Sequence, residues 1–196
     1  MPRVQSGRLR RLTAVAAAAL MGVTVLLGLS APAAAAPYYQ RLHNQFGNRL
    51  CLDAVNDATS NPGHNGDRVQ LWTCEPTNYW QWWEFQSAGT HNGNPVFKIV
   101  NWWGGTRCLD ARTDGSTNPN VEGDPVQIWN CESGAANQLW QFERNTRRIR
   151  SLYGNQLCLD ARYDAGGNPN QNGDKVQMWT CGGGSWQEWR RTEVSE

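Results

Sequence analysis

The stretch GDPVQIWNCESGAANQLWQF at residues 123–142 contains a glutamine two residues before a tryptophan twice, with a cysteine between the two pairs. Close relatives of it are GDRVQLWTCEPTNYWQWWEF at residues 66–85 and GDKVQMWTCGGGSWQEW at residues 173–189. An internal repeat of this kind indicates that one supersecondary unit is used three times. Aligned on their cysteines, the copies span residues 38–86 (copy one), 95–145 (copy two) and 147–196 (copy three).

Each copy alternates short β-type runs with turn residues. Copy two reads PVFKIVN, TRCLDA, DPVQIWN and QLWQF, four strand-like segments separated by glycine and polar residues. No segment after residue 37 has a helical period long enough to predict an α-helix. Twelve strands in three four-stranded repeats predict an all-β fold closed into a barrel with threefold pseudosymmetry, because closure leaves no exposed sheet edge.

Turn residues also recur by copy. A glycine follows an aromatic residue after the first strand, and we expect it to adopt a positive φ: Gly47, Gly104 and Gly154. The Gly/Asn-rich stretch QSAGTHNGN at residues 86–94 has no counterpart and predicts a nine-residue loop. An aspartate opens the long polar loop of each copy, where turn capping is favoured over a calcium site: Asp57, Asp114 and Asp164.

The N-terminus has the order of a secretory signal peptide. It contains four arginines and no carboxylate, then an apolar run from Leu12 to Leu29, then the small-residue segment APAAAAP. We therefore expect a signal peptide over residues 1–35, a mature domain over 36–196 and a secreted, extracellular protein. An uncleaved membrane anchor is the alternative, since the apolar run approaches spanning length.

The charge of the mature chain argues against nucleic acid as a partner. Removal of residues 1–35 takes four of the 18 basic residues and none of the 17 acidic ones, which leaves a formal charge of −3. No basic patch remains that could hold a phosphate backbone. The mature chain is also expected to have no membrane span and to be a monomer.

Six cysteines in an exported protein indicate disulfides. They could pair in 15 ways, but only pairing within each copy gives all three copies the same local structure. We therefore predict three bridges, Cys51–Cys74, Cys108–Cys131 and Cys158–Cys181. A zinc site is the alternative and is disfavoured, because there is no closely spaced cysteine pair and the histidines do not recur by copy. No metal and no cofactor is expected.

The motif CLDA, followed by GDxVQxW, a cysteine and QxW, resembles the ricin B-type lectins. The resemblance extends over residues 38–191 and occurs three times in order. It implies a β-trefoil that binds carbohydrate. It also implies that the tryptophan after the second cysteine is a buried anchor of each repeat: Trp83, Trp140 and Trp189.

The resemblance also implies a shallow sugar site in each copy. It would consist of the aspartate of CLD, the glutamine and aromatic residue of VQxW, and an Asn-Gln pair before the core tryptophan. Copy two matches at every position, with Asp110, Gln127, Trp129, Asn137 and Gln138. Copy one offers Asp53, Gln70, Trp72 and Gln81, and copy three offers Asp160, Gln177, Trp179 and Gln187.

Copies one and three depart from this pattern at one position. Trp80 and Trp186 stand where the family has asparagine, and an indole has one donor and no acceptor. We therefore expect these two sites to bind more weakly than copy two or to select a different or longer glycan.

The site residues also have a purely structural interpretation, because the aspartates could cap turns and the VQxW tryptophans could be core aromatics. Sugar binding is favoured, since a sugar presents C–H groups to an aromatic platform and hydroxyls to carboxylate or amide groups. On this view, substitution of Asp110 by alanine abolishes binding in copy two and leaves the fold nearly unchanged.

The sequence therefore predicts a non-catalytic, secreted lectin with up to three sites for galactose-type or xylan/arabinan-type glycans. Catalysis is not expected, because three aspartates related by threefold symmetry cannot form the closely spaced carboxylate pair of a glycosidase. A secreted protein-binding trefoil such as a protease inhibitor is the alternative, with the loop at residues 86–94 as its candidate contact.

Overall fold

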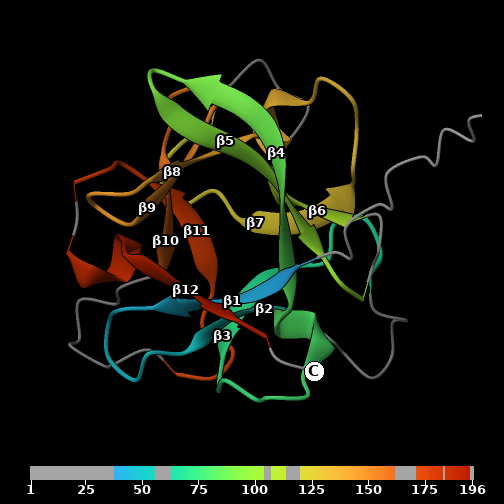
Figure 1. Ribbon diagram of the computed structural model, residues 1–196. Helices are drawn as coiled ribbons and strands as arrows, with labels where there is room; N and C mark the ends of the chain where they lie inside the picture. Colours follow the sequence, from blue (N-terminus) through green and yellow to red (C-terminus); the bar gives the residue numbers. More distant parts are fainter. Residues whose placement is uncertain are drawn as a thin grey trace, which may run out of the picture. The chain divides into compact units, whose positions relative to one another are not determined.

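The computed structural model describes residues 38–55, 63–103, 107–113, 120–161, 171–182 and 184–194. These residues form twelve β-strands and three single-turn 3₁₀-helices, and none of them belongs to an α-helix (Figure 1). Copy one holds β1 (Tyr39–Asn44), β2 (Cys51–Ala54), β3 (Val69–Trp72), η1 (Tyr79–Gln81) and β4 (Trp83–His91). Copy two holds β5 (Asn94–Asn101), β6 (Arg107–Ala111), β7 (Val126–Asn130), η2 (Ala136–Gln138) and β8 (Trp140–Glu143). Copy three holds β9 (Arg148–Ser151), β10 (Cys158–Ala161), β11 (Val176–Trp179), η3 (Ser185–Gln187) and β12 (Trp189–Glu193).

The topology repeats with the copies. Within each copy the second and third strands form an antiparallel hairpin: β2–β3, β6–β7 and β10–β11. The first and fourth strands form a nearly closed sheet in the order β9-β8-β5-β4-β1-β12. The backbone N–H of Trp189 donates to the carbonyl of Arg147 (2.9 Å), which links β12 to the start of β9. The fold is the predicted β-trefoil.

The three core tryptophans anchor the repeats as predicted. Trp83, Trp140 and Trp189 are each 0% exposed. Each indole N–H donates to the carbonyl of the leucine that follows the first cysteine of its copy: Leu52 (3.0 Å), Leu109 (2.8 Å) and Leu159 (3.0 Å). A buried indole N–H without an acceptor would destabilise the fold, so this bond fixes the fourth strand against the second.

The Gly-Asp loop of each copy holds the third strand of the next copy. Ile128 donates its backbone N–H to Asp67 O (2.9 Å), and Gly66 donates to Ile128 O (3.0 Å). The same pair of bonds joins copy two to three at Met178 and copy three to one at Leu71. The side chain of Asp67 caps its own loop by accepting from the backbone N–H of His64 (2.8 Å). Strand β7 is therefore positioned by copy one as well as by its own hairpin.

The stretch at residues 86–94 is not the predicted loop. Strand β4 continues to His91 and pairs with β5 from Asn94 onward, with a bulge between Ser87 and Thr90. The turn is Asn92-Gly93, with φ of 48° and 76°. Asn-Gly with two positive φ angles is the favoured two-residue hairpin turn, so the excess residues lengthen a hairpin (Figure 1, green).

The predicted disulfides and turn glycines can also be compared with the structure. The three disulfides are Cys51–Cys74, Cys108–Cys131 and Cys158–Cys181, with Cα–Cα distances of 5.1, 5.0 and 5.1 Å. Gly47 and Gly154 have φ of 54° and 53°, as expected, and Gly104 lies outside the described residues. In the part of the chain that the structure describes, no helix is long and apolar enough to span a membrane.

Candidate functional site

The aspartate of each CLD motif is paired across the hairpin with the glutamine of VQxW. The pairs are Asp53–Gln70, Asp110–Gln127 and Asp160–Gln177. Side chains alternate along a strand, so the leucine before each aspartate packs in the core while aspartate and glutamine share the opposite face. The VQxW tryptophan lies two residues further on that same face.

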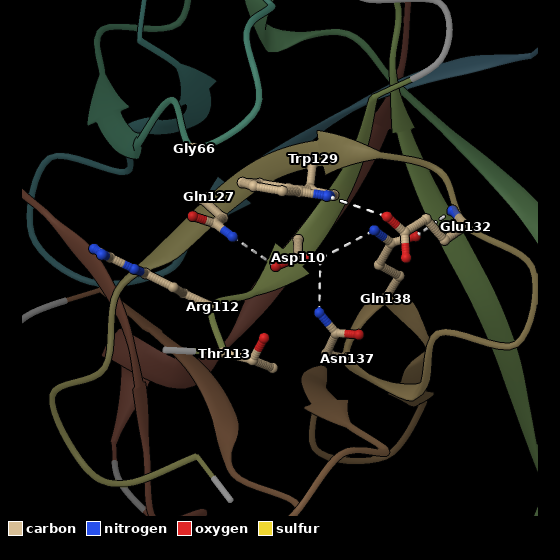
Figure 2. A pocket seen from close by; sticks show the side chains of 9 residues that line it. All are labelled: Gly66, Asp110, Arg112, Thr113, Gln127, Trp129, Glu132, Asn137 and Gln138. Atoms are coloured by element: carbon tan, nitrogen blue, oxygen red, sulfur yellow. Dashed lines mark hydrogen bonds between the residues drawn. The ribbon is translucent and has the colours of Figure 1, made fainter. Parts of the chain in front are cut away.

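In copy two the carboxylate of Asp110 accepts three side-chain amide bonds (Figure 2). Gln127 Nε2 lies 2.9 Å from Oδ1, while Asn137 Nδ2 and Gln138 Nε2 lie 2.7 and 3.0 Å from Oδ2. A carboxylate has about four acceptor positions, so one position remains for a further donor. The five residues predicted for copy two are thus brought together at one point.

These residues line a pocket of about 460 Å³. Trp129 forms one wall, and its indole N–H donates to Glu132 Oε1 (3.3 Å), which fixes the ring (Figure 2). Arg112 and Thr113 lie across the pocket from the indole. Because Trp129 is only partly buried, the VQxW tryptophan of this copy is not a core aromatic.

Gly66, in the Gly-Asp loop of copy one, also lines this pocket. It has φ of +94°, and a Cβ there would lie 3.8 Å from the ring of Trp129 and 4.0 Å from Oε1 of Gln127. Neighbouring copies therefore build the pocket together. Gly66, Glu132, Arg112 and Thr113 were not among the predicted site residues. Three of them belong to repeated motifs: Gly66 to the GDxVQxW motif of all three copies, Glu132 to the Cys-Glu pair of copies one and two, and Arg112 to the CLDAR run of copies two and three.

Copy one has an equivalent pocket of about 500 Å³, lined by Asp53, Gln70, Trp72 and Trp80 among others. Its third donor to the carboxylate is Asn78, whose Nδ2 lies 3.2 Å from Asp53 Oδ2. Asn78 is the N-cap of η1 and also accepts from the backbone N–H of Trp80 (3.1 Å). Asn78 was not among the predicted site residues, and it supplies from another position the bond that Trp80 cannot make.

Copy three differs. Among the described residues, the carboxylate of Asp160 accepts from two amides, Gln177 (3.1 Å) and Gln187 (3.0 Å). The N-cap of η3 is Gly184, over which the ring of Trp186 lies so closely that a Cβ would be 2.8 Å away. Trp186 packs against the core and meets Phe46 edge-on at 5.9 Å. Trp179 is 40% exposed.

Burial and amide hydrogen bonding have opposite effects on the pKa of each aspartate. Burial raises the pKa of Asp160 to about 6, while Gln177 and Gln187 stabilise the carboxylate and oppose the shift. Burial also raises the pKa of Asp53 and Asp110, against three amide donors at each. A pKa of about 6 leaves Asp160 mainly ionised at pH 7, where a hydroxyl donor would form a charge-assisted bond with it.

The last predicted glutamine of each site lies below the pocket surface. Gln81, Gln138 and Gln187 are 0%, 1% and 0% exposed. In copy two the amide of Gln138 donates to Asp110 and to Asn130 O (2.8 Å), and its Oε1 accepts from Glu132 N (2.8 Å). Copies one and three repeat these bonds. These glutamines thus tie the carboxylate to the loop that follows the second cysteine.

Among the described residues, one grouping of metal-binding side-chain types occurs, His43 with Cys51 and Cys74. Its two sulfurs are joined in a disulfide, so neither is a thiolate ligand. The predicted loop aspartates Asp57, Asp114 and Asp164 lie outside the described residues.

The family model of the ricin-type beta-trefoil lectin domain matches residues 95–196, which is more than half of the chain. The chain belongs to this lectin family. The match covers copies two and three of the trefoil lectin. No curated protein sequence matches the chain.

Solved structures share the fold at low sequence identity. A designed threefold-symmetric protein, ThreeFoil, is 22% identical with a TM-score of 0.60, over 79% of this chain and 96% of that one. The β-trefoil lectin of the Vibrio vulnificus hemolysin/cytolysin, with N-acetyl-D-lactosamine bound, is 19% identical (TM-score 0.56; 82% and 98%). The C-half of the earthworm R-type lectin, in complex with GalNAc, is 14% identical (TM-score 0.56; 81% and 99%).

Proposed function

We propose that this trefoil lectin is a secreted, non-catalytic carbohydrate-binding protein with a sugar site in each copy. The observation that carries the proposal is the environment of Asp110, a buried carboxylate held by three amides beside a partly exposed indole in an open pocket. A sugar hydroxyl can donate to the remaining acceptor position of the carboxylate, and the C–H face of the ring can lie against Trp129.

The predicted site residues keep distinct roles in this proposal. In copy two Asp110, Gln127, Trp129 and Asn137 contact the sugar, and the buried Gln138 positions the carboxylate. Copy one uses Asp53, Gln70 and Trp72, with Asn78 added. Copy three uses Asp160, Gln177 and Trp179 with one donor fewer, so we expect it to be the weakest site.

Galactose-type glycans are the first class to test. Two of the solved trefoil lectins cited above carry N-acetyl-D-lactosamine and GalNAc, which are sugars of this class. Xylan- or arabinan-type polymers are the second class. Several shallow sites on one monomer would gain affinity by engaging one polymer or surface together.

Secretion is part of the proposal and rests on the N-terminal segment and on the disulfides. Residues 1–35 have the order of a signal peptide, and three disulfides are typical of proteins in an oxidising compartment. Non-catalytic action is supported by the placement of the three buried aspartates, each in the hairpin of a different copy.

A glycan array tests the proposal, using the chain produced by secretion so that its disulfides form. The triple variant Asp53→Ala, Asp110→Ala, Asp160→Ala should lose binding at a temperature below its lowered melting point, where circular dichroism shows a folded trefoil. A control triple, Glu84→Gln, Glu188→Gln, Glu193→Gln, removes the same charge outside the two pockets described above and should bind like the parent. Absence of binding by the parent would favour a protein-binding trefoil instead.

A further inference from the structure

The site of copy one continues into an aromatic surface that is larger than those beside the other two sites. Trp80 lines the pocket of Asp53, and its ring lies 4.7 Å, centroid to centroid, from the ring of Trp103. Trp103 adjoins Trp102 at 6.0 Å, and Trp102 stacks on Tyr79 at 4.5 Å. We call these four residues, Trp80, Trp103, Trp102 and Tyr79, the aromatic shelf.

One side of the aromatic shelf packs on a buried ring, and the other side is exposed to solvent. Tyr79 and Trp102 meet the ring of Trp82 at 4.7 and 6.0 Å, and Trp82 is only 5% exposed. Trp103 and Tyr79, in contrast, are 46% and 38% exposed. The rings of Trp80 and Trp103 are inclined at 52°, so they do not cover each other face to face. Large aromatics kept exposed on a buried base are more typical of a binding surface than of packing alone.

The shelf does not follow from the threefold repeat. Its members in η1 correspond to Ala136 and Asn137 in copy two and to Ser185 and Trp186 in copy three. Its members after β5 correspond to Leu152 and Tyr153 after β9 and to Gln45 and Phe46 after β1, where Phe46 meets Trp186 but Gln45 adds no second aromatic ring. Of the third-copy residues, Trp186 packs against the core. Four of the five tryptophans outside the repeated positions, Trp80, Trp82, Trp102 and Trp103, therefore gather beside one site.

We infer that copy one binds a glycan chain, with one sugar in the Asp53 pocket and the adjoining sugars stacked on Trp80 and Trp103. This inference rests on the proposed function. A chain is the occupant because the shelf is continuous with the pocket through Trp80, which belongs to both. Its rings offer broad apolar faces, as the C–H faces of successive sugar rings require, whereas the hydrogen-bonding groups lie in the pocket. Copy two, with Ala136 and Asn137 in place of the η1 aromatics, keeps a single-sugar site.

The test uses the double variant Asp110→Ala, Asp160→Ala, in which copy one is the remaining intact site. Calorimetry measures its affinity for two ladders, each a series of sugars from the monosaccharide to the tetrasaccharide: galacto-oligosaccharides and xylo-oligosaccharides. We expect affinity for one ladder to rise about tenfold or more with length, the equivalent of roughly 1.4 kcal/mol. Trp103→Leu, which keeps an apolar contact with Trp80, should remove that gain. Tyr153→Leu, the equivalent change beside copy two, should leave it intact.

The possible outcomes distinguish failure of the extended site in copy one from failure of the proposed lectin function. Affinity that does not rise with length, or a rise unaffected by Trp103→Leu, would overturn the extended site while monosaccharide binding upholds the lectin. Failure of every sugar to bind the parent protein would overturn both. Quenching or a blue shift of tryptophan emission by the longer sugars, absent in Trp103→Leu, would support the shelf independently of calorimetry.

Discussion

Gln127 Nε2 lies 2.9 Å from Oδ1 of Asp110, and the two residues face each other across β6 and β7. The same contact measures 3.0 Å in copy one and 3.1 Å in copy three. Cross-strand neighbours on one face of an antiparallel pair lie side by side, so the backbone ladder sets this geometry before any ligand binds. The carboxylate is therefore oriented by the fold.

Substitution of Gln127 by alanine should weaken sugar binding by copy two about tenfold, since one of three charge-assisted bonds that orient Asp110 is lost. Calorimetry in the Asp53→Ala, Asp160→Ala background measures this site alone. The control Gln86→Ala changes an exposed glutamine of β4 and should leave affinity unchanged. Parent-like affinity in Gln127→Ala would show that the other two amides suffice.

Asp110→Ala should abolish binding by copy two. The sequence alone predicts a nearly unchanged fold, but the three amide bonds to Asp110 predict a destabilisation of about 1–3 kcal/mol, because buried amide donors lose their acceptor. Urea denaturation measures the change. Asp160→Ala is the matched variant, which orphans two described donors and removes a charge that burial already disfavours, so its effect should be smaller. Equal losses would show that the number of donors does not govern stability here.

Binding by copy three should fall as the pH drops through about 6, the pKa to which burial raises Asp160. Protonation removes the charge-assisted acceptor, while the additional amide donor at Asp53 and at Asp110 favours their charged forms. Side-chain carbon NMR of the three aspartates measures each titration. A midpoint for Asp160 no higher than those of the other two would contradict the prediction.

The raised pKa of Asp160 also predicts that the stability of the fold depends on pH. The folded state holds the Asp160 proton more tightly than the unfolded chain, whose pKa is near 3.8. The contribution of Asp160 to folding is therefore most favourable below 3.8 and is lost as the pH rises through about 6. Replacing Asp160 by asparagine should flatten the curve of unfolding free energy over this window in urea titrations.

Trp140→Ala should destabilise the domain by about 3–5 kcal/mol, the usual range for a fully buried tryptophan, and remove the bond to Leu109 O. Trp129→Ala alters a partly exposed indole of the same repeat, so it should change stability far less and eliminate sugar binding by copy two. Calorimetric melting and glycan binding, measured on both variants, separate the two roles. A reversal of the two patterns would overturn the assignment.

Arg191 breaks the threefold pattern of the barrel. It stands two residues after its core tryptophan, where the other copies have Phe85 and Phe142, and its guanidinium lies 4.8 and 4.5 Å from those rings. Arg191→Ala should destabilise the fold by about 1–2 kcal/mol through lost cation–π contact and packing. Arg190→Ala, an exposed neighbour, should change urea stability by less than about 0.5 kcal/mol.

Much of the fold followed from the sequence because its signals are local and repeated. Strand patterns with period two, equal cysteine spacing and the QxW tryptophans each occur three times, so the copies support one another. The long hairpin was missed although HNGN contains a favoured hairpin turn, because the glycine and asparagine of residues 86–94 were interpreted as a loop.

The site could be predicted only where its residues share a strand pair or follow the family motif. Asp110 and Gln127 are cross-strand partners, so a motif on each strand suffices to bring them together. Asn78 escaped detection because a 3₁₀ turn lets a side chain three residues before Gln81 reach the same oxygen, Oδ2 of Asp53, that Gln81 reaches. An alignment of the copies compares residues at the same position in the repeat. A hydrogen bond, however, can come from a side chain at another position that points toward the acceptor.

The sequence by itself determined the three repeats, their disulfides, the core tryptophans and one aspartate, glutamine and tryptophan per site, since each depends on contacts within a copy. Only the tertiary structure decided that Gly66 of copy one lines the pocket of copy two. It also decided that Trp80 lines a pocket whereas Trp186, at the equivalent position, packs on the core. These features depend on contacts between copies, where residues distant in sequence meet only after the barrel closes.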